Sequence, residues 1–134
     1  MAASRRKQIR DRAGDRCEYC HLPQSCTTLP HEVDHIRARK HRGRNTLQNY
    51  CWACAYCNSF KGSNAAGYDP DSDELVRLYN PRSDRWDDHF AWRGPKLVGK
   101  TPIARATIDV LRINQPDRVE HRRLLIAARL LTLG

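Results

Sequence analysis

Short apolar runs separated by polar turns make up the whole chain, and none is long enough to span a membrane. Residues 32–36 (EVDHI) lie between Pro30 and a polar loop, which predicts a strand. Residues 47–53 predict a second extended segment, and residues 55–61 predict a helix that ends at Gly62. The first half of the chain is therefore expected to contain two short strands followed by a helix.

The flanking segments predict further short elements. Residues 4–13 are expected to form a basic helix that ends near Gly14. Residues 69–74, which contain only Asp, Glu, Ser and Pro, predict a loop. Brief strands are expected after this loop at residues 75–79, 89–92 and 96–99.

Two helices are expected to complete the chain. Pro102 suits the first turn of a helix that runs to about Asn114. Asn114 then resembles the N-cap of the next helix, because Pro116 follows just inside its first turn. The apolar residues of 124–131 are expected to serve a core or an interface. Three aromatic residues are expected to pack a small sheet against these helices rather than to stack on bases: Trp86, Phe90 and Trp92.

Charge adds a functional constraint to this pattern. The 134 residues include 24 Lys and Arg against 15 Asp and Glu, a formal net charge of +9. An excess of this size favours partners made of phosphate, above all nucleic acid. Part of the positive charge flanks the first predicted strand, and these residues are candidates for contacts with a nucleic-acid backbone: Arg5, Arg6, Lys7, Arg10, Arg37, Arg39, Lys40, Arg42 and Arg44.

The cysteines and the start of the chain indicate a compartment. Residues 1–16 are rich in arginine and have no apolar run behind them, so no secretory signal is expected. Four of the six cysteines form two Cys-x-x-Cys pairs, which an intracellular protein usually uses for metal. The protein is therefore predicted to be cytoplasmic, with no membrane partner.

The two pairs, Cys17/Cys20 and Cys54/Cys57, have the spacing of a closed four-thiolate zinc site. A second pairing stays open, because Cys51 and Cys54 also form a Cys-x-x-Cys pair. The 54/57 pair is preferred, because it lies at the entry to the helix and leaves Cys51 as a small buried residue in a strand. The same buried role is expected for the remaining cysteine, at position 26.

In a plain zinc ribbon about 15–20 residues separate the two cysteine pairs. The interval between the two pairs of this chain is longer. From Val33 to Ser63 the sequence reads VDHIRARKHRGRNTLQNYCWACAYCNSFKGS. It resembles the motif of the HNH endonucleases: Asp-His, a loop, Asn, Cys-x-x-Cys, then His or Asn and a Lys. The resemblance covers about residues 14–63. It implies an α+β fold, a ββα-metal (His-Me) finger stapled by a structural Zn²⁺, with small strands and two C-terminal helices packed on it.

The resemblance also implies a role for five residues of a metal-dependent endonuclease. His35 would be the general base that takes a proton from the attacking water. Asp34 and Asn58 would hold a catalytic divalent ion such as Mg²⁺ or Mn²⁺, with Asn58 in the place of the last motif histidine. Asn49 would orient His35 through a hydrogen bond, and Lys61 would contact the scissile or adjacent phosphate.

These residue types suit phosphodiester hydrolysis. An imidazole exchanges protons near neutral pH, and a hard cation held by carboxylate and amide oxygens stabilises charge on the phosphoryl group. Asn58 and Lys61 are three residues apart on the predicted helix, so their side chains are expected on one face. Many relatives carry Gly-Gly in the loop where this chain has Arg42-Gly43, a departure that adds charge and puts the loop geometry in question.

Residues 1–68 are expected to form the nuclease core, and residues 69–134 a C-terminal extension packed as part of the same domain. The expected substrate is double-stranded DNA, with RNA as a weaker option. The alternative is a zinc-stapled nucleic-acid binding module without catalysis. His89 is a candidate to approach the active site. The other histidines outside the motif are expected to be solvated or in loops, with His41 a candidate DNA contact: His21, His31, His41 and His121.

Overall fold

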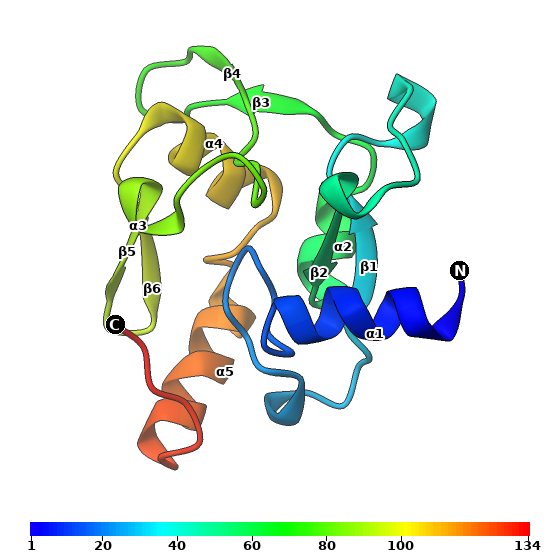
Figure 1. Cartoon of the computed structure of the whole chain (residues 1–134). Coiled ribbons are helices and arrows are strands. Elements are labelled where there is room, and N and C mark those ends of the chain that lie inside the picture. Colours follow the sequence, from blue (N-terminus) through cyan, green and yellow to red (C-terminus); the bar gives the residue numbers. More distant parts are fainter. The chain divides into compact units, whose positions relative to one another are not determined.

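The computed structural model describes residues 1–134 and has an α+β fold of short antiparallel strand pairs and short helices (Figure 1). This confirms the fold class predicted from the sequence. The chain divides into two compact units. One unit consists of residues 1–65 with 80–83, and the other of residues 66–79 with 84–134. None of the helices combines the length and the apolar character needed to cross a membrane.

The first unit contains the predicted strand–strand–helix arrangement. Strands β1 (Glu32–His35) and β2 (Tyr50–Ala53) pair in antiparallel fashion, and helix α2 (Ala55–Lys61) follows directly. Helix α1 (Ala3–Arg12) contacts β2, as seen in Figure 1. The extended segment predicted from residue 47 begins only at Tyr50, because Leu47–Asn49 forms a 3-10 turn, η3. Two further 3-10 turns lie in this unit, η1 (Gln24–Cys26) and η2 (Arg39–His41).

The core of the first unit is small. Ile9 from α1 packs with Tyr50 and Trp52 from β2, and all three side chains are buried. Alternation along the strands places these aromatic rings on one face of the hairpin. Arg82 belongs to this unit and donates a hydrogen bond to Glu18, within the first Cys-x-x-Cys pair. Because this apolar core is so small, a bound structural metal ion would add to the stability of the unit.

Helix α2 has clear signals at both ends. The Cys54 side chain accepts a hydrogen bond from the Cys57 backbone N–H and so serves as the N-cap. Gly62 ends the helix at a φ of 51°, in the left-handed region that favours glycine. These local signals explain why the helix has the predicted bounds.

The second unit contains two strand pairs and three helices. Strand β3 (Ala66–Tyr68) pairs with β4 (Leu75–Arg77), and β5 (Phe90–Arg93) pairs with β6 (Lys96–Gly99). Both pairs contact helix α4. The helices are α3 (Trp86–His89), α4 (Pro102–Val110) and α5 (Pro116–Ala127). The sequence did not predict β3 or α3, and His89 ends the helical turn rather than beginning a strand.

The predicted N-cap at Asn114 is wrong. Helix α4 ends at Val110, and Gln115 occupies the N-cap position of α5 without a side-chain hydrogen bond. The Asn114 side chain instead bonds both the backbone N–H and the carbonyl of Leu97, and accepts a hydrogen bond from Arg122. A tertiary contact with β6 therefore takes the side chain away from its local capping role.

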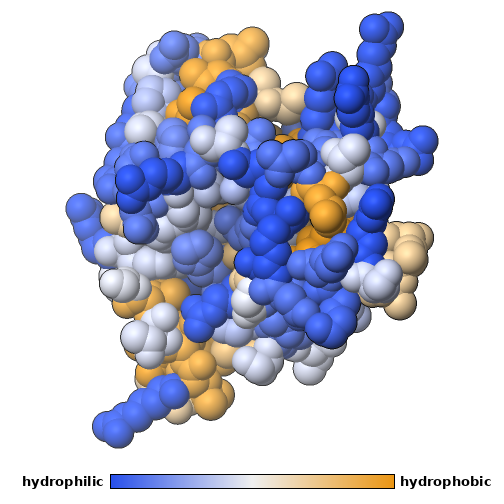
Figure 2. Space-filling view, in the orientation of Figure 1, coloured by the Kyte–Doolittle hydropathy of each residue, from blue (hydrophilic) through white to orange (hydrophobic).

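The aromatic residues of this unit pack together, as expected. The Trp86 ring lies 5.2 Å from that of Phe90 and 6.1 Å from that of Trp92, between centroids. The guanidinium of Arg122, on α5, lies 5.5 Å from the centre of the Trp92 ring. Most of the face seen in Figure 2 is hydrophilic, with apolar patches of limited extent. Two of the predicted core leucines, Leu124 and Leu130, are exposed.

Candidate active site and zinc site

Four cysteine side chains gather in the first unit. The Sγ atoms of Cys17, Cys20, Cys54 and Cys57 all lie within 4.8 Å of one another, and all four residues are buried. In each pair the sulfur of the first cysteine faces the backbone N–H of the second, at 3.5 Å for Cys20 and 3.4 Å for Cys57. Backbone N–H groups directed at sulfur stabilise thiolates. The cluster therefore indicates a zinc site, since four converging thiolates are the donor set of a closed structural zinc.

Burial raises the pKa of the Cys17 and Cys57 thiols well above the ordinary value, with the neighbouring cysteines as a second cause for Cys17. The thiols therefore stay protonated without a cation, and a zinc ion must release protons on binding. The donor set fits zinc both in its chemistry and in its convergence. Cys26 is only half-buried and lies outside the cluster, so the buried role expected for it is not found.

The structure brings Cys57 rather than Cys51 into the cluster. Cys51 is fully buried on β2, and its sulfur lies 3.5 Å from both the Tyr19 hydroxyl and the Asp34 carboxylate. It thus belongs to a second buried group, next to the zinc ligands in sequence but separate from them. Cys51 is therefore the small buried strand residue that was expected. The sequence did not indicate its two polar neighbours.

Asp34 is the centre of this second group. Its side chain is 4% exposed and pairs with the Lys61 ammonium, with Nζ 3.2 Å from Oδ1 and 3.1 Å from Oδ2. The Tyr19 hydroxyl donates to Oδ2 at 2.8 Å. Burial, followed by the nearby Cys51 and Asp34, raises the pKa of Tyr19 well above its ordinary value, so this hydroxyl keeps its proton and remains a donor. The carboxylate is therefore hydrogen-bonded on both oxygens.

Lys61 lies inside the protein, almost fully buried. Its side chain is 2% exposed, and Nζ also donates to the His35 carbonyl at 3.0 Å. The residue expected to contact a phosphate is thus held by partners within the protein. Lys61 instead ties α2 to the end of β1, because it bonds the side chain of one strand residue and the backbone of the next.

His35 lies beside Asp34 on β1, half-buried, and its ring points to different partners. The ring packs edge-on against Tyr50, its strand partner, with centroids 5.0 Å apart. Nε2 lies 2.9 Å from Oδ1 of Asn45. An amide oxygen only accepts hydrogen bonds, so Nε2 carries the proton and donates it. Nδ1, the second ring nitrogen, makes no hydrogen bond.

The Asn49 side chain does not make the expected hydrogen bond with His35. Its Oδ1 accepts from the Arg37 backbone N–H at 2.8 Å, and its Nδ2 donates to the carbonyls of Arg37 and Arg44 at 2.9 Å each. Asn49 thus closes the loop that leads from β1 to β2. The residue that does reach His35 is Asn45, four positions earlier, which no motif distinguished from its polar neighbours.

The loop closed by Asn49 explains the departure from Gly-Gly. A Cβ on Gly43 would lie 1.7 Å from the Arg37 carbonyl oxygen, so glycine is required there. Arg42 takes a left-handed φ of 66°, which a non-glycine residue adopts at some cost. The chain therefore keeps glycine at position 43, where the loop has no room for a side chain, and has the charged Arg42 at the other position of the pair.

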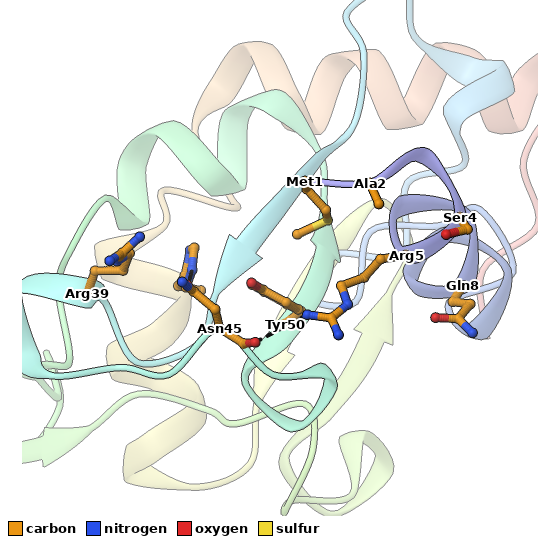
Figure 3. Close-up of a pocket in the computed structure, with 9 residues that line it drawn as sticks. Met1, Ala2, Ser4, Arg5, Gln8, Arg39, Asn45 and Tyr50 are labelled. Carbon is orange, nitrogen blue, oxygen red and sulfur yellow. Dashed lines mark hydrogen bonds between the residues drawn. The ribbon is translucent and has the colours of Figure 1, made fainter.

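A cavity of about 650 Å³ opens beside His35. Its walls come from the β1–β2 loop, from Tyr50 and from the start of α1, and Figure 3 shows the Arg5 side chain reaching from α1 toward Asn45 and Tyr50. The Arg5 guanidinium donates to the Asn45 carbonyl at 3.3 Å. Arg39 contributes a second positive charge. The cavity therefore offers a polar, cationic space at the imidazole.

The candidate backbone-binding residues divide into two groups. Arg5 and Arg39 line the cavity, and the other loop residues are exposed: Arg37, Lys40, Arg42 and Arg44. On α1, Lys7 and Arg10 pair with Asp11. Arg6 lies 4.8 Å from the centre of the Trp52 ring, also contacting Glu32. The loop and Arg5 are thus better placed for phosphate than the rest of α1, because Asp11 and Glu32 offset charge there.

Asn58 completes the candidate residues. It lies half-exposed on α2, one turn before Lys61, and its side-chain amide has no hydrogen bond. A carboxylate oxygen from Asp34 and an amide oxygen from Asn58 suit a hard divalent cation in kind. The Asp34 carboxylate could bind such an ion only if the Lys61 ammonium moved away from it, because the two groups form an ion pair. In this structure the Asp34 carboxylate is held by Lys61 rather than available to an ion.

The remaining histidines were expected in solvent or in loops, and His31 does lie in a loop, directly before β1, but it is not solvated. His31 is fully buried, with Nε2 2.8 Å from the Leu22 carbonyl and the ring packed near Trp52. It supports the first unit rather than lying in solvent. His89 belongs to the second unit, where Nδ1 lies 2.6 Å from the Thr101 hydroxyl.

The arrangement of the first unit agrees with one protein family. Residues 17–64, which include the cysteine cluster, Asp34, His35 and Asn58, match the family model described as HNH endonuclease. This segment is therefore similar to the HNH endonuclease family over residues 17–64. HNH domains are associated with nuclease or nucleic-acid-binding activity.

The chain is also similar to the Septu protein PtuB of Bacillus thuringiensis. The two sequences are 26% identical over 119 residues, which cover 87% of this chain and 44% of that protein. The chain therefore spans less than half the length of this relative. No solved structure matches the chain.

Proposed function

We propose that this protein is a metal-dependent endonuclease that hydrolyses phosphodiester bonds in DNA, with His35 as the general base. The observation that carries the proposal is the position of His35. Its imidazole lies at a cationic cavity, with one ring nitrogen held by Asn45 and the other without a partner. We assign the chemistry to the predicted nuclease core, residues 1–68.

In this reaction His35 accepts a proton from the attacking water. An imidazole exchanges protons near neutral pH and provides general-base catalysis of about 10²–10⁴-fold. Tyr50 packs on the ring and restricts its rotation, because the two residues are direct strand partners. Arg5 and Arg39 are placed to attract the phosphate to the cavity.

Asp34 and Asn58 would hold the divalent ion, Mg²⁺ or Mn²⁺. When bound, such an ion acts as a Lewis acid that stabilises charge on the phosphoryl oxygens and the leaving oxygen. Lys61 would then leave the Asp34 carboxylate, and its ammonium would be free to approach the phosphate. The phosphate contact proposed for Lys61 thus depends on this change of partner.

Double-stranded DNA is the proposed substrate. The net charge of +9 and the exposed arginines of the β1–β2 loop support binding through the phosphate backbone, which contributes affinity without sequence information. We also propose a cytoplasmic location, because a site of four reduced cysteines suits a reducing compartment.

One observation favours the alternative, a zinc-stapled binding module without catalysis. The carboxylate that should hold the divalent ion is paired with a buried ammonium at 3.1 Å. If that ion pair never opens, the HNH domain keeps its zinc and its basic loop but lacks the second metal.

Plasmid relaxation together with a DNA-binding assay separates the two functions. The full zinc-loaded chain is incubated with supercoiled plasmid and Mg²⁺ or Mn²⁺, and binding is measured in parallel. We expect metal-dependent nicking by the wild type and binding without nicking by His35→Ala. Binding without nicking by both proteins would establish the binding module instead. A parallel incubation with single-stranded RNA tests the weaker substrate option.

A further inference from the structure

Asn45 lies outside every motif position, yet it makes the hydrogen bond that reaches the imidazole of His35. The two side chains come from different elements: His35 ends β1, and Asn45 lies in the loop before η3. The bond joins Nε2 and Oδ1 over 2.9 Å. Of the polar side chains in this part of the loop, Asn45 is the one that meets the ring.

The chemistry of the amide decides which ring nitrogen is available. Oδ1 of Asn45 accepts a hydrogen bond, so a neutral His35 bonded to it carries its proton on Nε2. The lone pair is then on Nδ1, which has no partner in the structure. A general base needs an unprotonated nitrogen facing the reaction, and the hydrogen bond on the other nitrogen selects it.

We infer that Asn45 is a positioning residue that holds His35 in the Nε2–H tautomer and leaves Nδ1 to accept the proton. The inference rests on the proposed function for its catalytic meaning, because an orienting role matters only if His35 acts as a base. Asn45 thus takes the orienting task that the family motif gave to Asn49.

Two contacts hold Asn45 in place for this task. The Arg5 guanidinium, from α1, donates to the Asn45 backbone carbonyl at 3.3 Å. On the other side, Asn49 closes the loop through the Arg44 carbonyl, one residue before Asn45. The two contacts bracket the residue, and the first explains why the start of α1 forms part of the wall of the cavity (Figure 3).

The test combines a spectroscopic readout with kinetics on the full zinc-loaded chain. The ¹⁵N NMR spectrum of the imidazoles reports the tautomer of His35, assigned by its loss in His35→Ala. We expect the Nε2–H tautomer in the wild type and a mixture of tautomers in Asn45→Ala. Plasmid nicking by Asn45→Ala should show a kcat lower by about tenfold with an unchanged KM, the effect of losing one orienting hydrogen bond.

Two variants serve as controls. Asn45→Asp keeps an acceptor oxygen at the same position, so it should retain the Nε2–H tautomer and recover most of kcat. Gln48→Ala changes an exposed residue of η3 whose side chain makes no hydrogen bond with His35 or Asn45, and should behave as the wild type. Thermal unfolding of each variant confirms that it is folded.

The outcomes separate this inference from the proposed function. An Nδ1–H tautomer in the wild type overturns the inference, as does an Asn45→Ala protein with the wild-type spectrum and kcat. Nicking by the wild type with loss in His35→Ala would still uphold the proposed function in both cases. A chain that shows the Nε2–H tautomer but never nicks DNA overturns the proposed function and, with it, the positioning role of Asn45.

Discussion

Lys61 on α2 and Asp34 on β1 form an ion pair in which both side chains are almost fully buried, 2% and 4% exposed. Removing one partner of such a pair leaves an uncompensated charge in the protein interior, which is far more costly than losing a surface pair. The pair therefore links the stability of the first unit to the carboxylate proposed to hold a catalytic ion.

The first prediction concerns the stability contributed by this pair. Lys61→Met should lower the free energy of unfolding of the zinc-loaded chain by about 3–5 kcal/mol, because it leaves the Asp34 carboxylate unpaired. Urea denaturation measures the loss. The double variant Lys61→Met/Asp34→Asn should recover most of it, since neither charge is then present. A loss below about 1 kcal/mol for the single variant, as for an exposed pair, would show that the pair is not buried in solution.

The second prediction concerns competition between Lys61 and a divalent ion. If the two share the Asp34 carboxylate, Mn²⁺ should raise the thermal unfolding temperature of Lys61→Met more than that of the wild type, because ligands stabilise the folded state that binds them. Asp34→Asn in the same background should abolish the difference. Equal shifts in all three proteins would mean that the ion binds elsewhere or not at all.

The third prediction separates the zinc ligands from their neighbour. Cys57→Ala should lose the tightly bound zinc and unfold the hairpin and helix α2, because structural zinc contributes directly to folding. Cys51→Ala is the matched control: this cysteine is equally buried on β2 but lies outside the cluster, so its variant should retain about one zinc per chain. Elemental analysis and circular dichroism check both outcomes, and zinc loss from Cys51→Ala would contradict the assignment.

The fourth prediction concerns the second unit at low pH. The Arg105 guanidinium donates two hydrogen bonds to Asp69, at 2.9 and 2.8 Å, and holds the pKa of this carboxyl far below its ordinary value of 3.8. Because the pKa of Asp69 is lower in the folded state than in the unfolded state, its carboxylate stabilises the fold when the pH is above the unfolded-state pKa. This stabilisation is lost as the pH falls below about 3.8. The unfolding free energy of the wild type should therefore drop as the solution is acidified through this range.

Two variants check that Asp69 is the cause. Asp69→Asn should be less stable than the wild type at neutral pH and should show a smaller drop on acidification, as measured by urea denaturation. Asp87→Asn, at an exposed residue in the first turn of α3, should keep the wild-type dependence. An unchanged slope in Asp69→Asn would assign the acid sensitivity to other groups.

Those parts of the fold with local signals were predictable from the sequence. Helix α2 has the predicted bounds because a cysteine cap and Gly62 lie directly at its ends. The four cysteines were predictable because two knuckles of this spacing have few other uses. Strand β1 followed from Pro30 before it and from the polar loop after it.

The parts that were missed depend on contacts between distant residues. Asn114 has every local property of an N-cap, but β6 offers its side chain two backbone partners. Lys61 is a charged residue near a helix end, and only the fold reveals the carboxylate buried beneath it. Asn45 differs from its polar neighbours only in where the loop places it, so no pattern along the chain could identify it as the partner of His35.

The initial rate of plasmid nicking by the wild type and by His35→Ala tests the central claim most directly. We predict nicking that requires Mg²⁺ or Mn²⁺ and falls by roughly a hundredfold to ten-thousandfold in His35→Ala, as expected for the loss of a general base. His121→Ala, which changes a half-buried histidine on α5, should nick at the wild-type rate. Equal nicking rates for wild type and His35→Ala would contradict the account.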